Sequence, residues 1–117
     1  MLTREEILKK VDTQIKRVKV PEWGGEVKVR GMTGEERDAF EGGIAKVVNG
    51  KTIVDTKNIR ARLLVNCIVD EKGERLFSME DIEALGKKSA AALQRVFEVA
   101  GDLCGLTAGE IDKIEKN

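Results

Sequence analysis

The sequence contains no histidine and no tyrosine. Histidine is the commonest general base and metal ligand of proteins, and tyrosine is a common proton donor, so most acid–base sites cannot be built from this chain. The two serines, Ser78 and Ser89, stand where helices are predicted to begin, and helix capping explains both. A Ser-His-Asp triad or a Cys-His pair is excluded. The sequence therefore predicts no catalytic residue, no cofactor site and no metal site.

Charge of one sign is not in excess either, because 21 basic residues balance 21 acidic ones. Phosphate binding needs a basic surplus, so this balance argues against nucleic acid as the main partner, and it disfavours a membrane surface. No apolar run is long enough to span a bilayer, and the charged first ten residues do not resemble a secretion signal. We therefore expect a cytoplasmic protein with no nucleic-acid or membrane partner.

Cysteine is rare, with only Cys67 and Cys104 present. Both lie in apolar stretches predicted to be helical, and they do not form a Cys-x-x-Cys pair. This placement is typical of small buried hydrophobic residues in a reducing compartment. A disulfide between the two cysteines is the less favoured alternative.

Two short patterns suggest chemistry, and both are incomplete. Gly50-Lys51-Thr52 has the ending of a phosphate-binding loop, but the position that requires the first glycine holds Ala45. A simple turn at Asn49-Gly50 explains this segment better. The acidic pairs at 70–71 and 80–81 are typical of surface turns and helix starts, and no other reactive group accompanies them.

What is present predicts one domain, residues 1–117, with an α+β fold that is mostly helical. Alternating residues at 16–20 and 27–30 predict an antiparallel β-hairpin near the N-terminus, and the Pro/Gly segment 21–25 predicts its loop. Five or six short helices are expected. The first two span 3–10 and 33–49, and the third begins at Asp55 or Thr56 and ends near residue 68. The fourth spans 78–86, the fifth begins at Lys87 or Ser89 and ends near residue 104, and the last begins at Thr107. Residues 51–55 are expected to be a connector, and 68–77 a very short hairpin or an irregular turn.

Two regions are candidates for partner binding. Trp23, the only tryptophan, lies in the predicted hairpin loop, where it either folds back over the core or forms an exposed anchor. The last predicted helix carries Leu106, Ile111 and Ile114. These three residues either complete the core or offer an apolar stripe to a partner.

Residues 18–40 (VKVPEWGGEVKVRGMTGEERDAF) resemble the N-terminal half of tail assembly chaperones from long-tailed, non-contractile phages and related prophages. Those proteins share the Val-Pro-Glu-Trp-Gly-Gly turn, a short strand and a helix of the pattern Thr-Gly-x-Glu-Arg-Asp-x-Phe. The resemblance continues through 60–64 (RARLL), 69–73 (VDEKG), 76–78 (LFS) and 85–93 (LGKKSAAAL). It therefore covers almost the whole chain.

The resemblance implies a non-enzymatic helper that binds the long, helical tape measure protein and keeps it soluble. It also implies help in recruiting the tail tube protein, a site of action in the host cytoplasm and absence from the mature virion. The sequence does not decide whether the protein associates with itself. Two alternatives remain: a structural virion component, such as a tail-completion or connector protein, and a small nucleotide-binding protein or enzyme.

Overall fold

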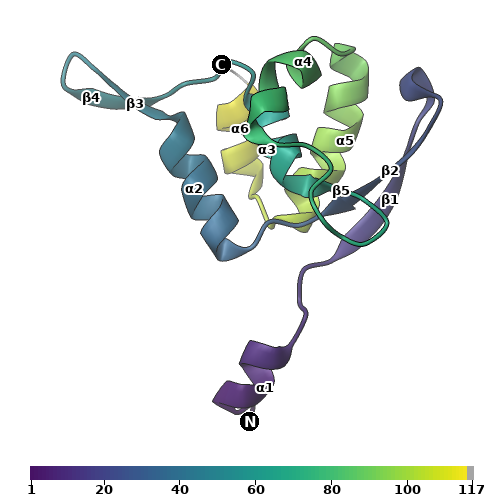
Figure 1. Ribbon diagram of the computed structural model, residues 1–117. Helices are drawn as coiled ribbons and strands as arrows, with labels where there is room; N and C mark the ends of the chain where they lie inside the picture. Colours follow the sequence, from purple (N-terminus) through teal and green to yellow (C-terminus); the bar gives the residue numbers. More distant parts are fainter. Residues whose placement is uncertain (116–117) are drawn as a thin grey trace.

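The computed structural model describes residues 1–115 and has an α+β fold (Figure 1). Within this range the helices are α1 (Arg4–Lys9), α2 (Gly34–Ile44), α3 (Ile59–Cys67), α4 (Ile82–Gly86), α5 (Ala90–Leu103) and α6 (Ala108–Glu115), with two 3₁₀ turns, η1 (Pro21–Trp23) and η2 (Met79–Asp81). The strands are β1 (Ile15–Val20), β2 (Gly25–Arg30), β3 (Ala45–Val48), β4 (Lys51–Val54) and β5 (Ile68–Val69). The predicted fold class, mostly helical with an N-terminal hairpin, is confirmed. None of the described helices combines the length and apolar character that a bilayer crossing requires.

The predicted N-terminal hairpin is formed by β1 and β2, which pair antiparallel with Val18 opposite Val27. Its loop is the 3₁₀ turn η1, and Pro21 suits the first position of such a turn because its φ is already fixed. Gly24 ends the turn at a φ of +73°, a conformation that favours glycine. The Pro/Gly segment therefore determines this loop locally.

A third strand completes the sheet, in the order β1-β2-β5. β5 pairs antiparallel with β2, with Val29 opposite Ile68. The chain then turns back through Gly73, at a φ of +84°, and an isolated bridge joins Val69 to Arg75. Residues 68–77, predicted as a very short hairpin or an irregular turn, form a turn closed by this single bridge, and β5 also joins the N-terminal sheet.

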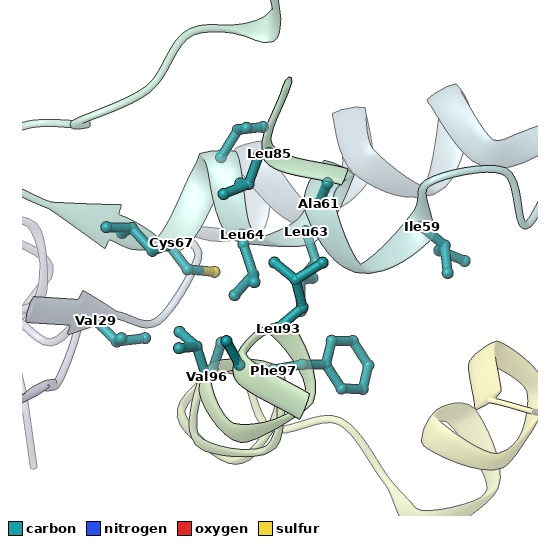
Figure 2. Packing of buried hydrophobic residues seen from close by; sticks show 14 of the residues in the cluster. Val29, Ile59, Ala61, Leu63, Leu64, Cys67, Leu85, Leu93, Val96 and Phe97 are labelled. Carbon is teal, nitrogen blue, oxygen red and sulfur yellow. The ribbon is translucent and has the colours of Figure 1, made fainter. Parts of the chain in front are cut away.

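The core lies where α3 packs against α5 and where α5 packs against the sheet (Figure 2). Leu63 and Leu64 of α3 and Phe97 of α5 are fully buried, as is Val29 of β2. Full burial of one such side chain contributes about 1.5 to 3 kcal/mol. α3 is buried on nearly all sides, which is typical of a central helix.

Five predicted helix starts are confirmed, the first of them at Thr3. The Thr33 hydroxyl accepts a hydrogen bond from the Glu36 N–H at 3.1 Å, and the Glu36 carboxylate accepts one from the Thr33 N–H at 2.9 Å. The hydroxyls of Ser89 and Thr107 accept hydrogen bonds from N–H groups of α5 and α6 in the same way. Ser78 begins the 3₁₀ turn η2 that leads into α4, and its own N–H and hydroxyl donate to the Asp81 carboxylate. Such caps satisfy N–H groups that have no partner within the helix.

The sequence prediction is wrong for residues 45–54. The helix predicted through residue 49 ends at Ile44, and the expected connector forms a second hairpin, β3–β4. Asn49 and Gly50 both have positive φ, of 53° and 78°, as a two-residue hairpin turn of type I′ requires. The β-branched residues around this turn favour strands, and two glycines at 42–43 weaken the helix before it.

The cap of α3 is also corrected. Neither Asp55 nor Thr56 caps this helix; its N-cap is Asn58, at a φ of 52° and without a side-chain capping bond. The Asp55 carboxylate instead accepts a hydrogen bond from the Lys57 N–H at 3.1 Å. Because α3 is held by its burial, it does not need a strong local cap.

The molecule is more extended than a compact domain of its length. Its radius of gyration is 15.2 Å, whereas a compact chain of this length gives about 13.4 Å. Its accessible surface is 7955 Å², against roughly 6300 Å² expected from its mass. α1 and the β3–β4 hairpin account for this shape, because both project away from the packed body (Figure 1). We call α1 with its following residue Val11, together with β3–β4, the projecting segments.

Candidate protein-binding surfaces

α1 is the first projecting segment. Thr3 caps it, accepting a hydrogen bond from the Glu6 N–H at 3.2 Å, and it has no buried residue. Its apolar side chains are in water: Ile7 is 57% exposed, Leu8 67%, and Val11, which follows the helix, 85%. The structure therefore leaves the apolar edge of this segment uncovered.

The β3–β4 hairpin is the second projecting segment, and all eight of its strand residues are exposed. Its cross-strand pairs are Ala45 with Val54, Lys46 with Ile53, Val47 with Thr52, and Val48 with Lys51. Because successive side chains alternate between faces, one face carries Ala45, Val47, Thr52 and Val54, and therefore no charge. The other face carries both lysines. Sequence reasoning missed this surface, although the Asn-Gly pair between valine-rich runs is a hairpin signal.

Trp23 lies at the tip of the N-terminal hairpin, half-buried against the core. It lines a shallow hollow together with Phe77, Leu85 and Lys88. The neighbouring Glu22 carboxylate accepts a hydrogen bond from Arg95 of α5 at 3.2 Å, which holds the loop onto the body. Trp23 thus covers part of the core, and its role in partner binding stays a prediction.

The candidate residues of the last helix lie against the body. Ile114 is buried, and Leu106 and Ile111 are half-buried against the core. An ion pair between Arg37 of α2 and Glu110 of α6 holds the start of α6. Leu106 and Ile114 also line a small cleft between α6 and α2. Their binding role likewise stays a prediction.

A charged cluster joins α2 to the sheet around Glu36. Its carboxylate lies 2.7 Å from the guanidinium of Arg30 and 2.5 Å from that of Arg75. The pKa of Glu36 lies below its ordinary value. Burial alone would raise this pKa, but the hydrogen bond from the Thr33 N–H and the two guanidinium groups favour the charged carboxylate more strongly. Both guanidinium groups bind this one carboxylate, so the cluster is a structural contact between elements.

The remaining acidic groups of interest serve local structure. Asp70 accepts hydrogen bonds from the N–H groups of Lys72 and Glu74, at 2.8 and 3.1 Å. Asp81 accepts one from the Ser78 N–H at 2.8 Å. Within residues 1–115, no three side chains of His, Cys, Asp or Glu are grouped so that they could hold a metal ion.

Comparison with known proteins gives a match over nearly the whole chain. Residues 4–116 match the family described as phage tail assembly chaperone. Among solved structures, the fold is similar to the tail assembly chaperone of bacteriophage HK97, with a TM-score of 0.59 and 24% sequence identity. The similarity covers 81% of this chain and 85% of the HK97 chain, and at this identity it shows the fold alone. No curated protein matches the sequence.

Proposed function

The chain belongs to the phage tail assembly chaperone family, and from this we propose that it binds the tape measure protein, keeps it soluble and helps to recruit tail tube subunits. The family is one of chaperones and not of enzymes. We propose that the protein acts without catalysis in the host cytoplasm, before the tail is complete, and that it is absent from the mature virion.

The exposed apolar side chains of the projecting segments are the observation that carries this proposal. A long helical tape measure protein exposes apolar stripes until the tube surrounds it, and a helper must cover those stripes. Isolated apolar side chains are common on protein surfaces, whereas contiguous apolar patches mark sites of interaction. The accessible surface of this chain is 7955 Å², whereas a compact domain of its mass has roughly 6300 Å². The difference is roughly 1650 Å². This difference is about twice the roughly 800 Å² that one partner buries in a standard protein interface.

Within the projecting segments, the uncharged face of β3–β4 is the best candidate for this contact. Its side chains Val47 and Val54 are both exposed, and no charge interrupts them. The lysine-bearing face is suited to water. We propose that the uncharged face covers an apolar stripe of the tape measure protein while Lys46 and Lys51 keep the complex hydrated.

Two adjacent valines provide a matched test, because Val47 and Val48 lie on opposite faces of the hairpin. The tape measure protein would be co-expressed with wild type, with Val47→Asp or with Val48→Asp, and its soluble fraction measured after centrifugation. We expect wild type and Val48→Asp to keep it in solution and Val47→Asp to lose most of it to the pellet. Full activity of Val47→Asp would contradict the assignment to this face. Failure of wild type itself would contradict the proposed function.

Mass spectrometry of purified virions separates the chaperone from a structural component. We expect the tape measure and tube proteins in the particle and no peptide of this chain. Peptides of this chain at a level comparable to the tube protein would instead favour a tail-completion or connector role. A nucleotide-binding protein or metalloenzyme would be stabilised by ATP or a divalent metal through mass action, and we expect no shift in Tm with either.

A further inference from the structure

The two cysteines, 37 positions apart in the sequence, meet at the ends of two core helices. Cys67 is the last residue of α3, and Cys104 directly follows α5. Their sulfur atoms are 3.8 Å apart, and both cysteines are reduced. Cys67 has no exposed surface, and Figure 2 shows it within the cluster of buried side chains. Cys104 is half-buried, so part of this residue is exposed to water. Cys67 is therefore sealed inside the core, whereas Cys104 lies at the edge of the core, where a small reagent would approach the pair from water.

The surroundings of Cys104 favour its thiolate form. Hydrogen bonding from the Cys67 thiol, the Met32 N–H at 3.2 Å and the positive charge of Arg37 all stabilise a negative sulfur. They outweigh burial and the negative charge of Glu36, and they lower the pKa of Cys104 below its ordinary value. The same contact with Cys104, together with burial, raises the pKa of Cys67. Because the thiolate is the reactive form of cysteine, the partly exposed residue of the pair is also the one whose thiolate is favoured.

We propose that Cys104 is a peroxide-reactive thiol and that Cys67 is its resolving partner, so that a peroxide converts the pair into an intramolecular disulfide. This site is independent of the projecting segments and of the proposed chaperone activity.

The reaction takes place in two balanced steps. The Cys104 thiolate attacks hydrogen peroxide, so an S–O bond forms, the O–O bond breaks, and the leaving hydroxide takes up a proton as water. Cys104 is then a neutral sulfenic acid, and the negative charge that held the proton on Cys67 is gone. The Cys67 sulfur attacks the Cys104 sulfur, the S–O bond breaks, and the released hydroxide leaves as water with the thiol proton of Cys67. Two sulfurs together lose two electrons, and one peroxide is reduced to two waters.

The positions of the two residues allow the bond to form. The sulfurs must approach from 3.8 Å to about 2.05 Å, a movement of roughly 1.8 Å. Each cysteine stands at a helix end, and Cys104 precedes Gly105, which has a φ of +71° and ends the α5 segment. Small rotations at these ends can supply the movement. The bond would join the ends of α3 and α5 and restrict the unfolded chain, so oxidation should raise Tm.

The first experiment treats the reduced full-length chain with hydrogen peroxide in the presence of free glutathione as an internal control. We expect the intact mass to fall by two hydrogens, peptide mapping to show Cys67 linked to Cys104, and Tm to rise by several degrees until dithiothreitol reverses the change. Oxidation of glutathione while the chain stays a dithiol would overturn the proposal. So would disulfide-linked dimers in place of the internal bond.

Two variants assign the roles of the cysteines. In Cys67→Ala the sulfenic acid cannot be resolved, so dimedone should trap a single adduct on Cys104. In Cys104→Ala the buried Cys67 should react with iodoacetamide at least about tenfold more slowly than Cys104 does in Cys67→Ala. Circular dichroism checks that both variants are folded. If Cys67→Ala is unfolded, dimedone added to the wild type during oxidation gives the same assignment. Equal reactivity of the two thiols, or an adduct on Cys67 in the wild type, would overturn the assignment.

Discussion

Val65 and Val47 are the same amino acid in two regions that differ in their surroundings. Val65 lies in α3 and has no exposed surface, whereas Val47 lies in β3 and is 71% exposed. The core and the projecting segments are both rich in branched apolar residues, so apolar content does not separate them. What separates them is a packing partner within the chain. Apolar side chains without such a partner remain available to another protein.

The two regions also differ in what stabilises their helices. α3 has no side-chain cap and is held by burial on nearly all sides. α1 has a Thr3 cap and two acidic residues in its first turn, yet it buries nothing. An isolated helix of this length is marginal in water, so the cap and the charges near the helix dipole are the interactions that favour α1.

The largest expected effect comes from truncating the core. Phe97 is fully buried and lies under the guanidinium of Arg60, 5.5 Å from the ring centroid. Phe97→Ala should lower the free energy of unfolding by about 3 to 5 kcal/mol, because it leaves a cavity. Val47→Ala in the projecting hairpin should change it by less than about 0.5 kcal/mol. Urea denaturation measures both, and similar losses would erase the distinction between the regions.

The next effect tests to which region α6 belongs. Because Ile114 is buried and Ile111 half-buried, Ile111→Asp with Ile114→Asp places charges against the core. We expect a loss of about 2 to 3 kcal/mol, less than full core disruption because a terminal helix can detach. Thermal denaturation would show this as a fall in Tm of several degrees. The matched pair Ile7→Asp with Leu8→Asp, on exposed α1, should leave Tm nearly unchanged. A stable α6 variant that no longer solubilises the tape measure protein would make α6 a binding element.

A smaller effect concerns acid stability. The pKa of Glu36 is lowered in the folded chain, so its stabilisation is fully present above its ordinary value of 4.5 and is lost as pH falls below it. Glu36→Gln keeps an oxygen that can accept from the Thr33 N–H but loses both charge pairs. We expect it to cost about 1 to 2 kcal/mol at pH 7 and measurably less near pH 3. Urea midpoints at both pH values test this, and an equal cost at both would show that charge plays no part.

The smallest expected effect is loss of a cap. Thr33→Ala removes the hydroxyl that accepts from the Glu36 N–H and should cost about 1 kcal/mol. Ser78→Ala should cost a similar or smaller amount. Both variants should still solubilise the tape measure protein in the co-expression assay. A fully stable Thr33→Ala that fails in this assay would move the start of α2 into the binding site.

Much of the fold could be predicted from neighbouring residues. Pro21 and Gly24 set the loop of the first hairpin, and the capping pairs at Thr33 and Thr107 mark helix starts. The second hairpin was missed because Phe40, Ile44 and Val47 also follow the helical period, and that pattern outweighed the Asn-Gly signal. Both patterns are present in the sequence, and the free energy of the folded chain favours the turn.

Local sequence determined the turns, the caps and the alternation of faces, because these depend on φ preferences and on hydrogen bonds between residues a few positions apart. Only the tertiary structure decided that β5 joins β2, that Cys67 meets Cys104, and that Val47 stays in water. Those outcomes depend on contacts between distant segments. Whether an apolar side chain is buried depends on whether another part of the chain reaches it, and no local pattern contains that information.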